Sequence, residues 1–184
     1  MKRLAFDSVD REVIWKLLRY YGVPLKIIHL IQQLYENAAC QVIHNGKLTE
    51  PFKVKTGVRQ GCLLSPMIFL IAVDWIMRRT TDNEVTGIKW TNTKTLEDLD
   101  FANDDICLVS HKLEDMQAKS NKLAQEASKI GLQVNIDKTE MMKIPGQQPQ
   151  QHQTTISMNG RNLKETTTFT YLGSIVSTTG QWNG

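Results

Sequence analysis

Two Asn-Gly dipeptides constrain the fold of this chain more than any other local feature. Asn45-Gly46 joins the extended stretches CQVIHN and FKVKTG, and Asn159-Gly160 lies inside ISMNGRNLK. Asn and Gly accept the positive φ angles of a two-residue hairpin turn, so each pair predicts two antiparallel strands. A further stretch, TFTYLGSIVS, is rich in β-branched and aromatic residues and is also predicted to be extended. The chain therefore contains antiparallel β-structure in both halves.

Helical periodicity separates these β segments. Apolar residues spaced three and four apart predict helices at 11–21, 25–37, 66–79 and 111–130. Asp10 is expected to cap the first helix, Gly22 to end it, and Pro24 to open the second. The third helix, PMIFLIAVDWIMRR after Ser65, is apolar on nearly every side and is predicted to be largely buried. Long helices interleaved with hairpins indicate an α+β fold, an antiparallel sheet backed by helices.

The length and composition are those of a globular protein. With 184 residues and 41% hydrophobic content, the chain is one domain or a piece of a larger protein. No apolar run reaches the roughly 18 residues of a membrane helix, and the start lacks the apolar core of a signal peptide. Three scattered cysteines without CxxC spacing argue against disulfides or zinc and are interpreted as buried thiols. We expect an intracellular protein of the nucleus or cytoplasm, neither secreted nor bound to a membrane.

Charge is unevenly distributed along the chain. Residues 1–60 contain ten Lys and Arg against five Asp and Glu, a balance of +5, whereas the remaining residues contain twelve against fourteen, a balance of −2. A basic front half beside an acidic centre suits a polyanion held near a metal site, although a solvated charged face has the same pattern.

The stretch LDFANDDICLVS, residues 99–110, places two adjacent carboxylates between apolar flanks. Asp104 and Asp105 fit an ordinary acidic turn, because Asp side chains bond nearby backbone amides. Half-buried flanks would instead demand a positive partner, since an unpaired charge in a low dielectric is very costly. Hard oxygen ligands of this kind suit Mg²⁺ and the chemistry of nucleotidyl transfer. Asp98 and Asp100 share one face of the preceding strand, where they either add to the acidic cluster or face solvent, and we expect them to face solvent.

A second candidate site is the loop TGVRQGCLLSP, residues 56–66. Gly57 and Gly61 allow the backbone to approach a ligand closely, Arg59 can hold a phosphate, and Gln60 can lie along a base or sugar. An ordinary strand-to-helix loop also contains glycines, so this reading stays open on the loop alone.

Five stretches together resemble one known family. AFDSVDR (5–11), GVRQGCLLSP (57–66), FANDDICLVS (101–110), GLQVNIDKTE (131–140) and TYLGSIVS (170–177) follow the order and spacing of the palm motifs of reverse transcriptases of non-LTR, LINE-type retrotransposons. The resemblance implies a polymerase palm that performs RNA-directed DNA synthesis with two Mg²⁺ ions. Its partners would be an RNA template, a DNA primer and a dNTP, and the parent polypeptide can carry an endonuclease domain.

The resemblance also implies roles for individual residues. Asp104 and Asp105 are the catalytic metal ligands, and Lys138 approaches the leaving pyrophosphate. Phe6 senses the sugar 2′ position, while Arg59, Gln60 and Gly61 flank the incoming nucleotide and the template. Tyr171, Leu172 and Gly173 form the centre of a primer-gripping hairpin.

The resemblance also implies a division of the chain. By this reading residues 1–144 are the palm, 145–155 a Gln/Pro-rich loop, and 156–184 a hairpin region leading toward the thumb. Within the palm, LQVNIDKTEMMKI is predicted as two short strands around Asp137-Lys138.

Two departures from the family pattern bear on activity. A metal-binding aspartate lies four residues before the alanine of AFDSV in the family, and here that position is Met1. The segment is therefore interpreted as a palm fragment without its fingers strands. The hairpin reads Phe-Ala-Asn-Asp-Asp instead of Phe-Ala-Asp-Asp. The extra residue, Asn103, is either absorbed as a bulge or turns the aspartates to the wrong face of the hairpin. We expect an enzyme by family whose residues 1–184 are inactive or nearly so. The alternatives are a non-catalytic remnant that binds nucleic acid or a partner, and an unrelated two-metal nuclease, which leaves GVRQGCLLSP and TYLGSIVS unexplained.

Overall fold

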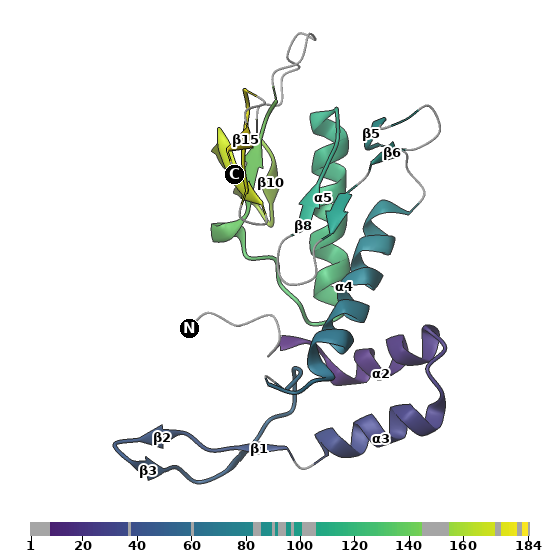
Figure 1. Ribbon diagram of the computed structural model, residues 1–184, viewed down its shortest axis with the longest axis vertical. Coiled ribbons are helices and arrows are strands. Elements are labelled where there is room, and N and C mark those ends of the chain that lie inside the picture. Colours follow the sequence, from purple (N-terminus) through teal and green to yellow (C-terminus); the bar gives the residue numbers. More distant parts are fainter. Residues whose placement is uncertain are drawn as a thin grey trace. The chain divides into compact units, whose positions relative to one another are not determined.

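The chain forms two compact units, and each is described by itself (Figure 1). The computed structural model describes residues 8–36, 38–59, 61–82, 86–89, 91, 95–96, 98–100, 106–144, 155–171, 174–179 and 182–183. The first unit comprises Met1–Trp75 and Ser128–Leu132, and the second comprises Ile76–Ala127 and Gln133–Gly184. In the part of the chain that is described, no helix is long and apolar enough to cross a membrane.

Two amphipathic helices build the first unit. Helix α2 spans Arg11–Tyr20, and the Asp10 carboxylate caps it by accepting hydrogen bonds from two backbone N–H groups of the first turn. Gly22, at φ +80°, ends it, because few other residues adopt that angle without strain. Helix α3 spans Leu25–Tyr35 after Pro24. The two helices contact each other, and their buried side chains are Ile14, Trp15, Leu17, Leu18, Ile28, Ile31 and Tyr35. Both helices are as predicted.

An exposed β-ribbon follows α3 in the first unit. Strands β1 (Ala39–Cys40) and β4 (Phe52–Lys53) pair antiparallel, as do β2 (Ile43–His44) and β3 (Lys47–Leu48). Asn45 and Gly46 lie at φ +50° and +74°, the conformation that a tight hairpin turn requires. The first Asn-Gly prediction is therefore confirmed.

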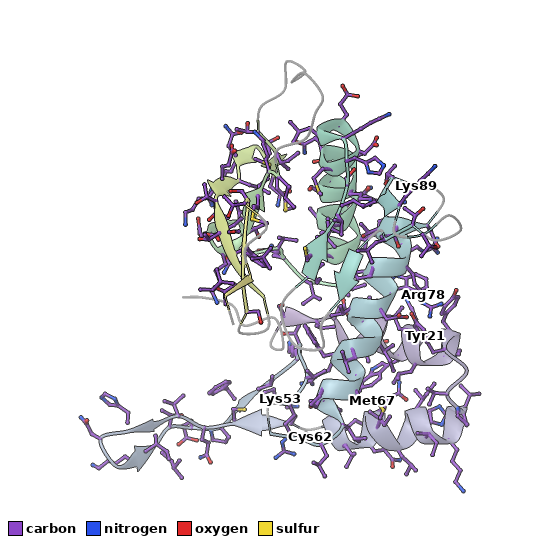
Figure 2. The ribbon with its side chains drawn as sticks, turned by 45° about the horizontal axis from the view of Figure 1, so that its top comes forward. Tyr21, Lys53, Cys62, Met67, Arg78 and Lys89 are labelled. Atoms are coloured by element: carbon purple, nitrogen blue, oxygen red, sulfur yellow. The ribbon has the colours of Figure 1, made fainter. Side chains whose placement is uncertain are left out.

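Helix α4, Ser65–Thr81, begins in the first unit and ends in the second. Within the first unit Tyr21 donates a hydrogen bond of 2.5 Å to the Asp74 carboxylate of α4, and Tyr21 is labelled in Figure 2. The expectation that α4 is largely buried is wrong. One side is buried, but Met67 is 63% exposed and Leu70 is 41% exposed. An apolar sequence shows that a helix can be buried, but the neighbouring elements decide how much of it is covered.

The second unit contains a small core and helix α5, Leu113–Lys129, whose last two residues are counted with the first unit. Met141, Ile156, Met158 and Leu163 form this buried cluster, against which Leu113, Met116, Ala124, Val134 and Ile136 pack. The expectation of two strands around Asp137-Lys138 is half wrong. A short 3₁₀ helix, η1 (Ile136–Lys138), precedes a single strand, β9 (Glu140–Met142).

The strands of the second unit form short separate sheets. The described strands outside the aspartate hairpin are β5 (Ile88–Lys89) with β6 (Thr95–Leu96), β10 (Ser157–Met158) with β11 (Arg161–Asn162), β9 with β12 (Lys164–Thr166), and β13 (Thr168–Tyr171) with β14 (Ser174–Ser177) and β15 (Trp182–Asn183). Asn159 and Gly160, at φ +51° and +76°, make the second predicted hairpin turn. The β9–β12 pair is parallel, while the others are antiparallel. The mixed helix and strand content is confirmed, and a single palm sheet remains a prediction.

The three cysteines are free thiols, but they are not buried. Cys40 is exposed, and Cys62 and Cys107 are partly exposed. Their interpretation as buried thiols is therefore wrong, because they lie on a ribbon, a loop and a strand at the surface of their units.

Candidate active site

The loop between β4 and α4 carries the first group of predicted site residues. Gly57 and Gly61 lie at φ +80° and +81°, so this loop makes two left-handed turns that favour glycine. The backbone N–H of Gly57 donates to the Val9 carbonyl at 2.8 Å. This bond ties the loop to the turn that follows the AFDS stretch.

Arg11, the first residue of α2, binds the same loop with its guanidinium group. Its Nε donates to the Gly57 carbonyl at 2.9 Å, and its two terminal nitrogens donate to Val54 at 2.7 Å and to Thr56 at 3.3 Å. The guanidinium also lies 4.9 Å from the centre of the Tyr35 ring, within the range of a cation–π contact. Burial lowers the pKa of Arg11 from its ordinary value, and Tyr35 opposes this shift.

Arg59 has a fixed backbone and a free side chain. Its N–H donates to the Tyr35 hydroxyl at 3.4 Å, and its carbonyl accepts from the Ser65 hydroxyl at 2.5 Å. The side chain is exposed and makes no hydrogen bond or ion pair with the described part of the chain. Gly61 follows on the same loop, whereas Gln60 lies outside the described residues. The loop therefore presents a cation that is open to an anionic ligand.

Cys62 lies on this loop just before α4, where Figure 2 labels it. A hydrogen bond from the backbone N–H of Leu64 is the main reason that the pKa of the Cys62 thiol lies below its ordinary value. Partial burial opposes this shift, and Ser65 and the charge of Arg59 reinforce it. The environment before the helix therefore favours negative charge.

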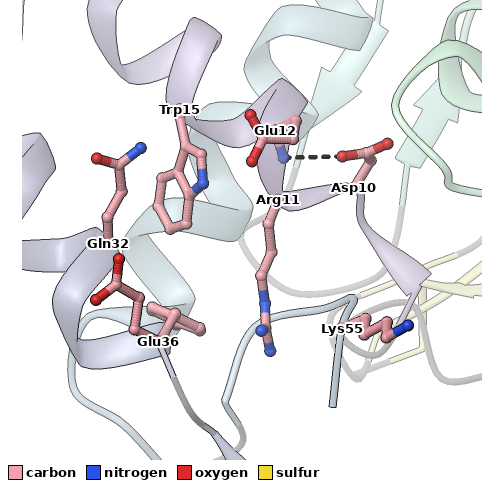
Figure 3. A pocket seen from close by; sticks show the side chains of 8 residues that line it. Asp10, Arg11, Glu12, Trp15, Gln32, Glu36 and Lys55 are labelled. Atoms are coloured by element: carbon pink, nitrogen blue, oxygen red, sulfur yellow. Dashed lines mark hydrogen bonds between the residues drawn. The ribbon is translucent and has the colours of Figure 1, made fainter. Parts of the chain in front are cut away.

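A polar pocket of about 310 Å³ opens beside Arg11 in the first unit. Figure 3 shows the Arg11 side chain extended away from α2. The pocket is lined by Asp10, Arg11, Glu12, Trp15, Gln32, Tyr35, Glu36 and Lys55. Its lining mixes acidic and basic groups, so it has no preference for a ligand of one charge.

The aspartate stretch is framed by a β-hairpin in the second unit. Strand β7 (Asp98–Asp100) pairs antiparallel with β8 (Ile106–Leu108), and the register places Asp100 opposite Ile106. The side chains of β8 are half-buried. Asp104 and Asp105 lie outside the described residues, as do the side chains of Asp98 and Asp100. Among the described residues, no group of three or more Asp, Glu, His or Cys side chains is arranged to hold a metal ion.

The remaining predicted site residues are placed as follows. Lys138 is exposed and ends η1, and an ion pair between Asp137 and Arg161 links η1 to β11. The backbone of Tyr171 ends β13, which forms a hairpin with β14, and Tyr171 is opposite Ser174. Phe6, Leu172 and Gly173 lie outside the described residues. The structure thus brings Arg59 and Gly61 together on one loop of the first unit, while Lys138 and Tyr171 belong to the second.

Two residues of the site region escaped sequence reasoning. Arg11 was part of the AFDSVDR stretch but had no role, because its partners are carbonyls 43 to 46 residues away. Gly131 directly follows the predicted helix 111–130 and likewise had no assigned role. A Cβ atom on it would lie 2.7 Å from the Ser8 carbonyl oxygen and 3.1 Å from the Asp10 nitrogen. Sequence signals were present, an Arg after a capping Asp and a Gly at a helix end, but neither signal identifies a distant partner.

Comparison with known proteins decides the family. Residues 3–176 match the sequence profile of the reverse transcriptase (RNA-dependent DNA polymerase) family. The chain belongs to the reverse transcriptase family. This reverse transcriptase segment is similar to the Pol polyprotein of the type-2 retrotransposable element R2DM of Drosophila melanogaster, with 32% identity over 96% of the chain and 17% of that protein. It is also 26% identical to the Pol polyprotein of the type-1 element R2 of Popillia japonica, over 97% of the chain and 30% of that protein.

A third similar protein comes from a transposon of a frog. The segment is 29% identical to the transposon TX1 149 kDa protein of Xenopus laevis over 68% of the chain and 9% of that protein. The chain thus spans less than a third of the length of these relatives. The resemblance to reverse transcriptases of non-LTR retrotransposons is confirmed.

Proposed function

We propose that this chain is the palm segment of an RNA-directed DNA polymerase that joins a dNTP to a DNA primer on an RNA template. The observation that carries the proposal is the antiparallel pairing of β7 with β8. The Asp104–Asp105 stretch lies in the sequence between these two strands, and the side chains of β8 are half-buried. A carboxylate pair in such a position needs a cation. The family match supports the same assignment.

The donor chemistry of the hairpin fits Mg²⁺. Asp104 and Asp105 are hard oxygen donors, the ligand type that Mg²⁺ prefers together with substrate phosphates. They are proposed to hold the two ions of the family reaction, which when bound supply charge that stabilises the attacking and leaving oxygens. Asp98 and Asp100 are not proposed as metal ligands, because they are expected to face solvent.

The other residues are proposed to bind and orient the substrates. The free Arg59 guanidinium binds the triphosphate through charge-assisted hydrogen bonds, and Gln60 and Gly61 lie against the nucleotide and template. Lys138, exposed at the end of η1, neutralises the departing pyrophosphate. Phe6 is proposed to sense the sugar 2′ position. Tyr171, at the end of β13, is proposed to grip the primer together with Leu172 and Gly173.

The polypeptide of residues 1–184, assayed by itself, is proposed to extend primers slowly or not at all. Position 1 is Met where the family pattern has an aspartate, and Asn103 lengthens the hairpin by one residue. These two features favour a second function, binding of template and primer without catalysis. Restoring an aspartate at position 1 within a fingers segment and deleting Asn103 should recover Mg²⁺-dependent extension. If the repaired chain binds a primer–template but stays inactive, the catalytic assignment is wrong and the binding function stands.

A thermal unfolding experiment tests the metal assignment without requiring activity. We expect millimolar Mg²⁺ to raise the Tm of the native chain, because a ligand that binds only the folded state stabilises it. The double variant Asp104→Asn/Asp105→Asn should lose this shift. The matched control Asp98→Asn/Asp100→Asn removes the same charge from the same hairpin and should keep the shift. Equal shifts in all three proteins would show that the aspartate pair is an ordinary acidic turn.

A further inference from the structure

In the first unit one side chain joins the start of α2 to the loop that carries Arg59. Val9 and Asp10 lead into α2. The loop 54–59 ends with Arg59, which is proposed to bind phosphate. Arg11, at the start of α2, donates to the carbonyls of Val54, Thr56 and Gly57. We propose that Arg11 is the positioning residue of this loop, holding it in the shape that presents Arg59 to a triphosphate. The inference rests on the proposed function for the role of Arg59.

The chemistry of the contact requires arginine. A guanidinium group is planar and carries five donors in a fixed fork, so one side chain can serve three carbonyls of a single turn. Within the described residues its partners are these carbonyls and the Tyr35 ring rather than a carboxylate. Lysine, a compact charge with three rotatable donors, cannot reproduce this arrangement.

Arg11 is linked to Arg59 through Tyr35 and Ser65. The Tyr35 ring lies beside the Arg11 guanidinium, and the Tyr35 hydroxyl accepts from the Arg59 N–H and lies 3.3 Å from the Ser65 hydroxyl. Ser65, 2% exposed, donates to the Arg59 carbonyl. The backbone of Arg59 is therefore held on both sides, while its guanidinium has no hydrogen-bond partner among the described residues. Such a preorganised cation loses less freedom when it binds an anion.

Amide hydrogen exchange on the 184-residue chain tests the proposal. The N–H of Gly57 bonds to the Val9 carbonyl and the N–H of Cys62 to the Arg59 carbonyl, so both amides report on the loop. In Arg11→Gln and Arg11→Lys we expect their protection to fall at least about tenfold, which corresponds to about 1.4 kcal/mol, the size of a hydrogen bond to a charged group. The matched control Arg19→Gln removes the same charge from the exposed side of α2 and should leave both amides unchanged.

The protection of α2 itself separates positioning from general stabilisation. We expect the amides of the buried Leu17 and Leu18, in the second half of α2, to keep their protection in both Arg11 variants. If α2 loses protection as much as the loop, Arg11 is a general stabiliser and the proposal is wrong. Unchanged loop protection in Arg11→Gln, or full rescue by Arg11→Lys, would also overturn it.

A binding measurement separates this inference from the proposed function. Calorimetric titration with inorganic triphosphate should show binding to the native chain that Arg59→Gln abolishes and Arg11→Gln weakens several-fold. Equal affinity of the native chain and Arg11→Gln would overturn the positioning role. If the native chain binds no triphosphate, the role proposed for Arg59 fails, and the exchange data alone decide whether Arg11 positions the loop.

Discussion

Replacing Gly131 with alanine tests how closely the GLQVNIDKTE stretch must approach the turn before α2. Gly131 has φ +81°, and a Cβ atom there would lie 2.7 Å from the Ser8 carbonyl oxygen. The two segments are also joined there by a hydrogen bond of 3.0 Å from the Asp10 N–H to the Ile130 carbonyl. Because both contact atoms of the new Cβ belong to the backbone, the turn or residues 128–132 must move. We expect Gly131→Ala to destabilise the first unit and to loosen the turn.

The magnitude follows from three contributions. An alanine in the left-handed region costs about 1–2 kcal/mol. Loss of a glycine stabilises the folded state by about 0.4–1 kcal/mol through the unfolded chain. Breaking or stretching the Asp10 hydrogen bond, and displacing the backbone, costs about a further 1–2 kcal/mol. We therefore expect a loss of about 2–3 kcal/mol in the free energy of unfolding.

Gly22→Ala is the matched control for this substitution. Gly22 belongs to the same unit and has φ +80°, but nothing lies within 4 Å of the position of its Cβ atom. Both variants carry the φ penalty and the gain from the unfolded chain, so their difference isolates the close approach. Urea-induced unfolding should place Gly131→Ala about 1–2 kcal/mol below Gly22→Ala. Equal stabilities would refute the claim that the approach to Ser8 and Asp10 requires glycine.

Three further outcomes are expected. Asp10→Ala should lower the free energy of unfolding by about 1 kcal/mol in denaturant titrations, because α2 loses its cap; an unchanged value would contradict the capping geometry. Ile156→Ala, at a side chain 0% exposed, should lower the free energy of unfolding by about 2–5 kcal/mol. Ile144→Ala, at a side chain 67% exposed, should change it by no more than about 0.5 kcal/mol, and similar losses in both variants would show that the cluster around Ile156 is not a core. Cys62, whose pKa is lowered, should be alkylated faster than Cys40 at pH 7, with a ratio that shrinks as pH rises past the ordinary thiol pKa; a constant ratio would contradict the lowered value.

Several features of this protein could be predicted because they depend on neighbouring residues alone. The Asn-Gly turns at 45–46 and 159–160 follow from backbone angles that few other residues accept. The start of α2 follows from the Asp10 side chain, which reaches its own first turn. The family could be recognised in the same way, because its motifs are short stretches in a fixed order and residues 3–176 match its profile.

The predictions that were wrong concern the burial of a helix and of the cysteines, and the pairing of strands. For these features the sequence shows only a preference, and the elements that pack against the segment decide the outcome. An apolar helix such as α4 is covered only where other elements lie against it, so Met67 remains 63% exposed. Residues 132–135 were predicted to be extended but pair with no strand in the described part of the chain, and the chain enters η1 after them. Strand β9 finds its partner in β12, more than twenty residues later and in the parallel direction.

The sequence by itself determined the hairpin turns, the starts of α2 and α3, the order of the family motifs and hence the choice of candidate site residues. Only the tertiary structure decided that Arg11 binds the loop before Arg59 and that Gly131 lies against Ser8 and Asp10. The physical reason is range. Caps and turns are closed by atoms a few residues apart, whereas the carbonyls that Arg11 binds and the backbone that excludes a Cβ at Gly131 come from distant segments, which meet only when the whole unit has packed.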